Sequence, residues 1–174
     1  MAPHLFRILE FREYDVIVPL ICHRCGNCCR KYHPSVEPEL LPEIGRILRK
    51  PIHEIQSRLR EDCEAYHAGS PKDCCFFNPA DNTCSIHEIK PEPCRVFPSP
   101  TEAGAGNVDC PGHKEHMNVV NEFLKDGRFL SVRNPSSSRG ARGIPAGERP
   151  NIMKKLVKAN ASENLVRNFI EVNK

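Results

Sequence analysis

The chain carries the stretch CHRCGNCC at residues 22–29, in which four of eight residues are cysteine. Cys22 and Cys25 have the Cys-x-x-Cys spacing that lets two thiolates reach one metal ion while the backbone between them turns. Gly26 suits the left-handed conformation that such a turn requires. A further cysteine three residues on makes the Cys-x-x-Cys-x-x-Cys run of iron–sulfur loops. Because neighbouring residues seldom bind one ion, we expect Cys29 to reach a second metal or another part of the site.

The composition indicates that the cysteines hold the fold together. The 174 residues include 10 cysteines and 16 prolines, but no tryptophan, eight phenylalanines and three tyrosines. That is a small supply of large apolar side chains, so we expect cross-links through the cysteines. The N-terminus lacks the apolar run of a secretory signal, and no stretch approaches the roughly 18 apolar residues of a membrane span. We therefore expect a cytoplasmic protein without membrane contact, where reducing conditions favour metal-bound thiolates over disulfides.

Charge divides the chain into an acidic part and a basic tail. Residues 1–126 hold 15 Lys and Arg against 19 Asp and Glu, whereas residues 127–174 hold 10 against 3. We expect a cysteine-cluster metal-binding domain at 1–126, a flexible basic linker at 127–151 and a C-terminal amphipathic helix at 152–174. The tail's Arg residues are spaced by Ser and Gly with few aromatics, which weakens the case for nucleic acid. A protein partner is the favoured expectation.

The predicted fold class is mainly α, small and irregular, with helices and long loops organised around a cysteine-ligated metal centre. Apolar residues at helical spacing predict four helices. They lie at residues 38–48 (starting between 38 and 42), 52–69, 111–126 and 152–173. Residues 5–21 alternate loosely and predict one or two short strands. Residues 70–112, rich in Pro and Cys, are predicted to be irregular and ordered by a metal.

A second cysteine stretch reads CCFFNPADNTCSIHEIKPEPCRVFP at residues 74–98, and Cys110 follows at the next predicted helix. The order of features from the first motif to Cys110 resembles the CxxCxxCC, or YkgJ-type, cysteine-cluster family of zinc- or iron-chelating domains. The shared features are the first motif, two helices, a Cys with an apolar pair, Cys-Arg-x-aromatic-Pro and a last Cys. The region is also similar to the cysteine domain of flagellin lysine N-methylases. The resemblance covers about half of the chain.

The resemblance implies eight metal ligands. They are Cys22, Cys25, Cys28, Cys29, Cys75, Cys84, Cys94 and Cys110. Cys63 and Cys74 fall outside the pattern; Cys63 lies on an apolar helical stripe and is expected to be a buried structural thiol. Cys74 is either a spare ligand or an exposed redox-active thiol. Arg95 matches the family's Cys-Arg pair, so we expect its guanidinium to offset thiolate charge near sulfur.

Several polar residues near the cysteines are not expected to bind the metal. His113 and His116 lie three residues apart at the start of the third predicted helix and are expected at the surface rather than on a metal. His23, inside the first motif, is expected to face solvent. His87 and Lys90 stand where the family commonly has Tyr and Arg, and these two differences leave every sulfur in place.

Three functions compete. Eight thiolates make two four-sulfur sites or one larger cluster, and their count suits zinc and iron–sulfur alike. The Cys-x-x-Cys-x-x-Cys run favours an iron–sulfur cluster (4Fe-4S first) for electron transfer or redox-linked chemistry, with Zn²⁺ as the alternative cofactor. A structural zinc module presenting a partner- or nucleic-acid-binding surface is the second function, and a metal-dependent protein-modifying enzyme resembling the methylases is the third. The sequence has neither a glycine-rich S-adenosylmethionine motif after a strand nor the radical-enzyme spacing Cys-x-x-x-Cys-x-x-Cys, so it does not argue for an enzyme.

Overall fold

A computed structural model describes residues 6–30, 33–69, 73–96, 109–132 and 143–174. Contacts divide the chain into two compact units. We call the first the sheet unit; its described residues are 6–23, 111–132 and 143–174. We call the second the cysteine unit; its described residues are 24–30, 33–69, 73–96 and 109–110.

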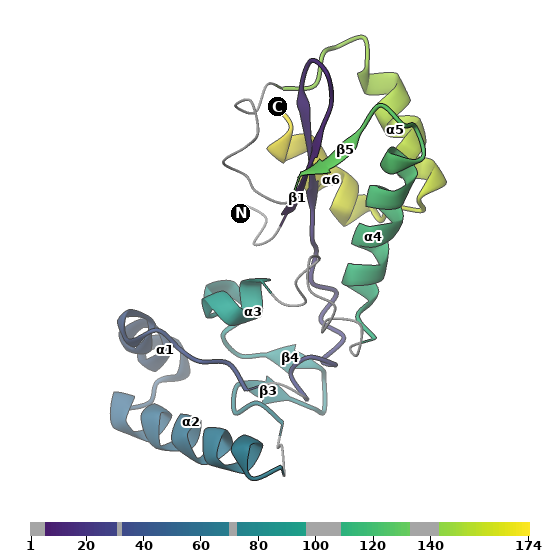
Figure 1. Ribbon diagram of the computed structural model, residues 1–174. Coiled ribbons are helices and arrows are strands. Elements are labelled where there is room, and N and C mark those ends of the chain that lie inside the picture. Colours follow the sequence, from purple (N-terminus) through teal and green to yellow (C-terminus); the bar gives the residue numbers. More distant parts are fainter. Residues whose placement is uncertain (1–5, 31–32, 70–72, 97–108, 133–142) are drawn as a thin grey trace. The chain divides into compact units, whose positions relative to one another are not determined.

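The sheet unit is built on a three-stranded antiparallel sheet with the strand order β2-β1-β5 (Figure 1). The strands are β1 (Phe6–Glu10), β2 (Asp15–Pro19) and β5 (Leu130–Val132). A hydrogen bond of 2.9 Å from the Phe11 amide to the Tyr14 carbonyl closes the β1–β2 hairpin. The strands predicted within residues 5–21 are thus confirmed. β5 lies inside the segment predicted as a linker, and its pairing with β1 shows that part of this segment is ordered.

Three helices complete the sheet unit: α4 (Pro111–Leu124), α5 (Arg149–Lys158) and α6 (Glu163–Val172). Their apolar faces and the sheet enclose one core, in which the rings of Phe123 and Phe169 stack with centroids 6.0 Å apart. This core accounts for the order of the sheet unit, because burial of apolar surface is the main stabilising term in folding.

The prediction of a single helix over residues 152–173 is wrong. α5 ends at Lys158, and Asn160 takes a left-handed conformation with φ 53°. Ser162 is extended, and its side chain accepts the Leu165 amide, so it caps a new helix. The apolar periodicity continues across this break, which is why the pattern alone predicts one helix.

The cysteine unit begins with a helical hairpin and continues with very short elements (Figure 1). The hairpin consists of the 3₁₀ turn η1 (Pro38–Leu40), α1 (Leu41–Leu48) and α2 (Ile52–His67). After it come β3 (Phe77–Asn78), β4 (Thr83–Cys84), the 3₁₀ turn η2 (His87–Ile89) and α3 (Glu92–Val96). A left-handed Arg49 with φ 52° ends α1, and Pro51 precedes α2.

The predicted mainly α class is confirmed in its helices, and two small sheets are added to it. The helices predicted near 38–48, 52–69 and 111–126 correspond to α1, α2 and α4. Within the described residues, none of the helices has the length and apolar character needed to cross a membrane.

Candidate metal centre

The motif at residues 22–29 leaves β2 as extended chain and ends in a turn. Gly26 is left-handed, with φ 76°, as predicted from the sequence. A Cβ here would lie 2.6 Å from the Arg30 guanidinium and 2.6 Å from the Phe77 ring, so a side chain would displace both. The Arg30 amide donates to the Gly26 carbonyl at 3.0 Å, and its guanidinium carbon lies 4.7 Å from the Phe77 ring centroid. The motif's turn is therefore fixed against the first residue of β3.

Backbone hydrogen bonding joins the two cysteine stretches. The Cys74 amide donates to the Cys29 carbonyl at 2.9 Å, across 45 residues of sequence (74 − 29). The Cys28 and Cys29 sulfurs lie 3.9 Å apart. This thiol–thiol hydrogen bond, followed by burial, raises the pKa of the Cys28 thiol. The structure thus brings the end of the first motif and the start of the second stretch together, as the resemblance implies.

Cys74 is the buried member of the Cys74–Cys75 pair, with 8% of its surface exposed. The Cys75 thiol donates to it, and the amides of Phe76 and Phe77 also hydrogen bond to it. These donors hold the pKa of the Cys74 thiol below its usual value despite burial. A thiolate stabilised by backbone amides is prepared to ligate a metal, because thiolates rather than thiols bind metals.

Cys94 lies within the electrostatic reach of three other cysteines. Burial, followed by the negative charge of neighbouring thiolates, raises the pKa of the Cys94 thiol to about 12. In order of effect, these neighbours are Cys74, Cys28 and Cys84. The Lys90 ammonium acts in the opposite direction on both Cys94 and Cys28. Thiols from separate segments therefore lie within electrostatic reach of one another in the cysteine unit, and the Lys90 ammonium acts on two of them.

Cys75 faces a different partner. Its amide donates to an Asp62 carboxylate oxygen on α2 at 2.9 Å. The hydrogen bond to Cys74 is the largest cause that raises the pKa of the Cys75 thiol, followed by burial, and Asp62 adds to the effect. Of the two thiols, Cys74 is therefore the one whose anionic form is favoured. The resemblance assigns Cys75 and not Cys74, and the only signal in the sequence for Cys74 is its position next to Cys75.

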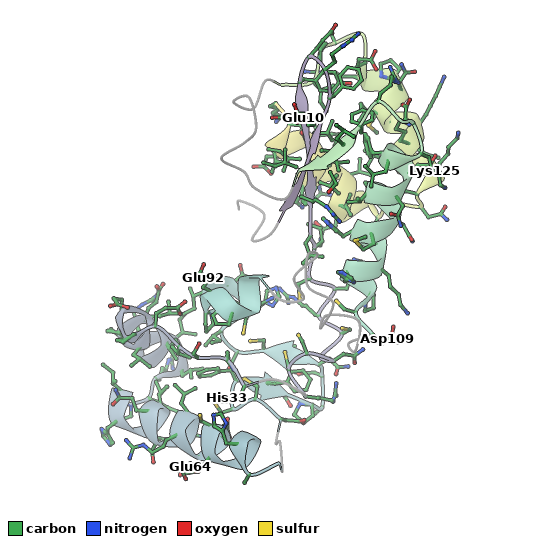
Figure 2. The ribbon with its side chains drawn as sticks, viewed as in Figure 1. Glu10, His33, Glu64, Glu92, Asp109 and Lys125 are labelled. Atoms are coloured by element: carbon green, nitrogen blue, oxygen red, sulfur yellow. The ribbon has the colours of Figure 1, made fainter. Side chains whose placement is uncertain are left out.

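The remaining short elements hold Cys84 and Cys94 in place. Cys84 pairs with Phe77 in the β3–β4 ladder, and the Ser85 amide donates to the Phe76 carbonyl at 2.9 Å. Cys94 lies on α3 and is half-buried. Figure 2 shows sulfur atoms gathered around β3 and β4 in this unit.

The other predicted ligands are placed as follows. Cys25 is half-buried in the cysteine unit, and Cys110 at the end of that unit is buried. The Asn27 side chain donates to the Asp109 carbonyl at 2.5 Å, which connects the motif's turn to the residue before Cys110. Cys22 is exposed and belongs to the sheet unit. Cys63 on α2 is half-buried rather than buried as predicted.

All ten cysteines lie in described parts of the chain, and all are thiols rather than disulfides. Within those parts, no three His, Cys, Asp or Glu side chains are already arranged as ligands of a single ion. Several thiols lie in the same unit, but the described side chains do not form the complete coordination sphere of one ion. Arg95 belongs to α3, but its side chain, and so its predicted place beside sulfur, lies outside what the structure describes.

One of the histidine expectations needs correction. His116 on α4 is fully buried rather than at the surface, with Nδ1 3.2 Å from the Pro19 carbonyl oxygen. Burial lowers the pKa of His116 to about 4. His23 is exposed, as expected, and its Nε2 also lies 2.5 Å from a carboxylate oxygen of buried Glu115. Sequence periodicity places His116 on a helix but cannot show that the first motif's lead-in packs over it.

The donor set fits soft metal ions, because converging thiolates suit zinc and iron–sulfur clusters rather than calcium or magnesium. A family model described as "putative zinc- or iron-chelating domain" and named CxxCxxCC matches residues 21–111. No curated protein and no solved structure matched the chain. The matched segment spans more than half of the 174 residues and contains all ten cysteines of the chain. With its first motif and its gathered thiols inside that segment, this chain belongs to the CxxCxxCC family of zinc- or iron-chelating domains.

Proposed function

We propose that the predicted cysteine ligands hold iron as an iron–sulfur cluster, 4Fe-4S in the first instance, and that the protein serves electron transfer or redox-linked chemistry. The observation that carries this proposal is the convergence of thiols around Cys94. Its support from sequence is the Cys-x-x-Cys-x-x-Cys run, which is typical of iron–sulfur loops. When bound, such a cluster supplies one-electron transfer. Zinc in four-thiolate sites is the alternative cofactor, since the same donors suit it.

We further propose that Cys74 joins the ligand set in place of Cys75. Cys74 is the buried member of the pair, and the Phe76 and Phe77 amides favour its anionic form. Cys75 instead lies beside the Asp62 carboxylate, which disfavours a second negative charge. The other seven predicted cysteines stay in the proposal, with Cys28, Cys84 and Cys94 as its centre.

Metal analysis of anaerobically purified protein tests the cofactor. We expect iron and acid-labile sulfide, with an absorption band near roughly 400 nm from thiolate-to-iron charge transfer. Zinc without iron or sulfide would overturn the iron–sulfur proposal and leave the structural zinc module. Purified protein that contains neither iron nor zinc would overturn metal binding itself.

The two adjacent cysteines provide a matched pair of variants for the ligand assignment. We expect Cys74→Ser to lose most of the metal, because it removes a ligand thiolate. We expect Cys75→Ser to retain it, because a serine hydroxyl still donates to the Cys74 sulfur. Metal per chain, measured by mass spectrometry, reports both. The reverse result would restore the original assignment to Cys75. The protein partner and the cytoplasmic location expected from the sequence stay predictions.

A further inference from the structure

A buried carboxylate on α4 connects the first cysteine motif to the C-terminal helices. Glu115 is 8% exposed, and each of its carboxylate oxygens has its own donor. Oε2 accepts a hydrogen bond from His23 Nε2 at 2.5 Å. Oε1 accepts the backbone amide of Ser162, the residue that caps α6. A buried carboxylate is costly unless its oxygens are satisfied, so both donors are needed for Glu115 to be tolerated here.

The chain that leads into the motif is fixed against the same face of α4. The His116 ring lies one residue after Glu115, and its Nδ1 is 3.2 Å from the Pro19 carbonyl oxygen. A Cβ on Gly112 would overlap the Ile21 carbonyl oxygen and lie 3.1 Å from the His23 ring, so the helix approaches this segment through a glycine. Three successive contacts therefore hold the segment on α4, and the His23–Glu115 pair is the last before the chain reaches Cys25.

His23 occupies a decisive place in the motif, because it lies between Cys22 and Cys25 in the sequence. The conformation of the intervening residues sets how two such thiolates approach a metal. Next to His23, Arg24 has φ 54°, a conformation that non-glycine residues seldom adopt without external constraint. The carboxylate on His23 Nε2 supplies a constraint directly beside this residue.

We infer that Glu115 is a positioning residue for the metal site: through His23 it holds the turn between Cys22 and Cys25 in its metal-binding conformation. Its other carboxylate oxygen ties His23 and this turn to Ser162, the residue that caps α6. This inference rests on the proposed function, since it assigns a role toward the metal that the cysteines hold. Replacing a residue that orients a metal ligand lowers the affinity for the metal by about 10- to 100-fold.

The test compares two Glu→Gln variants on one helix in the full chain. Glu115→Gln removes the charge that binds His23, whereas Glu122→Gln, two turns along α4, removes a carboxylate bound to Lys125 at 2.9 Å. The readout is the rate at which the purified proteins lose their bound metal to excess EDTA. We expect about a tenfold or greater acceleration for Glu115→Gln. We expect no change for the Glu122→Gln control.

Hydrogen exchange separates positioning from general stability and works with or without metal. We expect Glu115→Gln to speed exchange at residues 19–25 while residues 117–124 of the same helix stay as protected as in the control. Unchanged exchange at 19–25 and unchanged metal loss would overturn the inference. A lower melting temperature with unchanged metal loss would overturn it too, because it would mean a purely structural role.

A second variant guards against misfolding of the first. His23→Gln lies on a side chain that is 32% exposed and should leave the fold intact. If the pair acts as a unit, the double variant His23→Gln/Glu115→Gln loses metal no faster than either single variant. Additive effects would overturn the inference. If the wild-type chain binds no metal, the proposed function fails, and the exchange data still decide whether Glu115 fixes the turn.

Discussion

The sheet unit and the cysteine unit are held together by different means. In the described residues of the sheet unit, a core of 14 buried residues includes the aromatic rings of Tyr14, Phe123, Phe129 and Phe169. The corresponding core of the cysteine unit has seven buried residues, one of which is Cys74, with Cys29, Cys75 and Cys84 packed against it. The sheet unit can be stable through apolar burial alone, whereas the cysteine unit builds its core around its own candidate ligands.

Electrostatics strengthens this contrast. In the cysteine unit the pKa values of the Cys28, Cys75 and Cys94 thiols are all raised, with burial among the causes of each. Forming several thiolates there without a cation is unfavourable, because buried like charges repel. A bound metal reverses this balance and couples the folding of this unit to metal binding.

The largest expected effect comes from metal removal. We expect chelation under reducing conditions to abolish hydrogen-exchange protection in α1 and α2 while α4 to α6 stay protected. Structural metal sites of four thiolates contribute on the order of 10 kcal/mol to folding, more than the small core of the cysteine unit can replace. Mass spectrometry of exchanging peptides from both units provides the measurement. Equal loss of protection in the two units would show that both depend on the metal.

A core truncation in the sheet unit should have the opposite signature. Phe123 is fully buried between Phe129 and Phe169, so Phe123→Ala leaves a cavity. We expect the free energy of unfolding of the sheet unit to fall by about 3–5 kcal/mol while metal per chain stays constant. Urea unfolding followed through peptides of α4 measures it. Leu130→Ala is the control, because Leu130 is 66% exposed and should change this free energy by less than about 0.5 kcal/mol.

The features that the sequence predicted correctly are those that depend on residues close together in the chain. Strong helical periodicity predicted α1, α2 and α4, and turn chemistry predicted the left-handed Gly26. These features depend on neighbouring residues in the sequence, which a single sequence contains. The motif also indicated which segments meet, as the Cys74–Cys29 hydrogen bond shows.

What sequence reasoning missed depends on contacts between distant segments. The break between α5 and α6 follows from a left-handed Asn160 and the cap at Ser162, neither of which interrupts the apolar pattern. The burial of His116 depends on β2 and the lead-in to the motif packing over α4. The family pattern assigns Cys75, and only the amides around Cys74 and the carboxylate of Asp62 favour Cys74 instead.

An intermediate effect is expected when acid protonates the buried histidine of the sheet unit. Burial lowers the pKa of His116 to about 4 from its usual 6.5, with small contributions from His113 and Arg7. The unfolded chain then binds a proton between pH 6.5 and 4 that the folded chain does not, so stability falls as the pH falls through this range. The loss is up to about 3 kcal/mol. His116→Asn, which can keep a donor to the Pro19 carbonyl, should flatten this dependence.

The check on this prediction is the difference in unfolding free energy between wild type and His116→Asn, measured from pH 7 to pH 4.5 on the same peptides of α4. The subtraction removes the contributions of carboxylates and thiols that both proteins share. The two curves should converge as the pH falls. Parallel curves would mean that His116 does not titrate in this range in either state.

The smallest effect is expected from the cap of α6, in the short loop that separates α5 from α6 in the sheet unit. The Ser162 hydroxyl accepts the Leu165 amide at 3.2 Å and caps α6. We expect Ser162→Ala to lower the unfolding free energy by about 1 kcal/mol, with Ser162→Asp restoring most of it. Because the bond to Glu115 uses the Ser162 backbone amide, it survives both substitutions. The rate of metal loss to EDTA should therefore match wild type in both variants. Faster loss from Ser162→Ala alone would show that the cap of α6, and not only the Glu115 carboxylate, helps the cysteines to retain the metal.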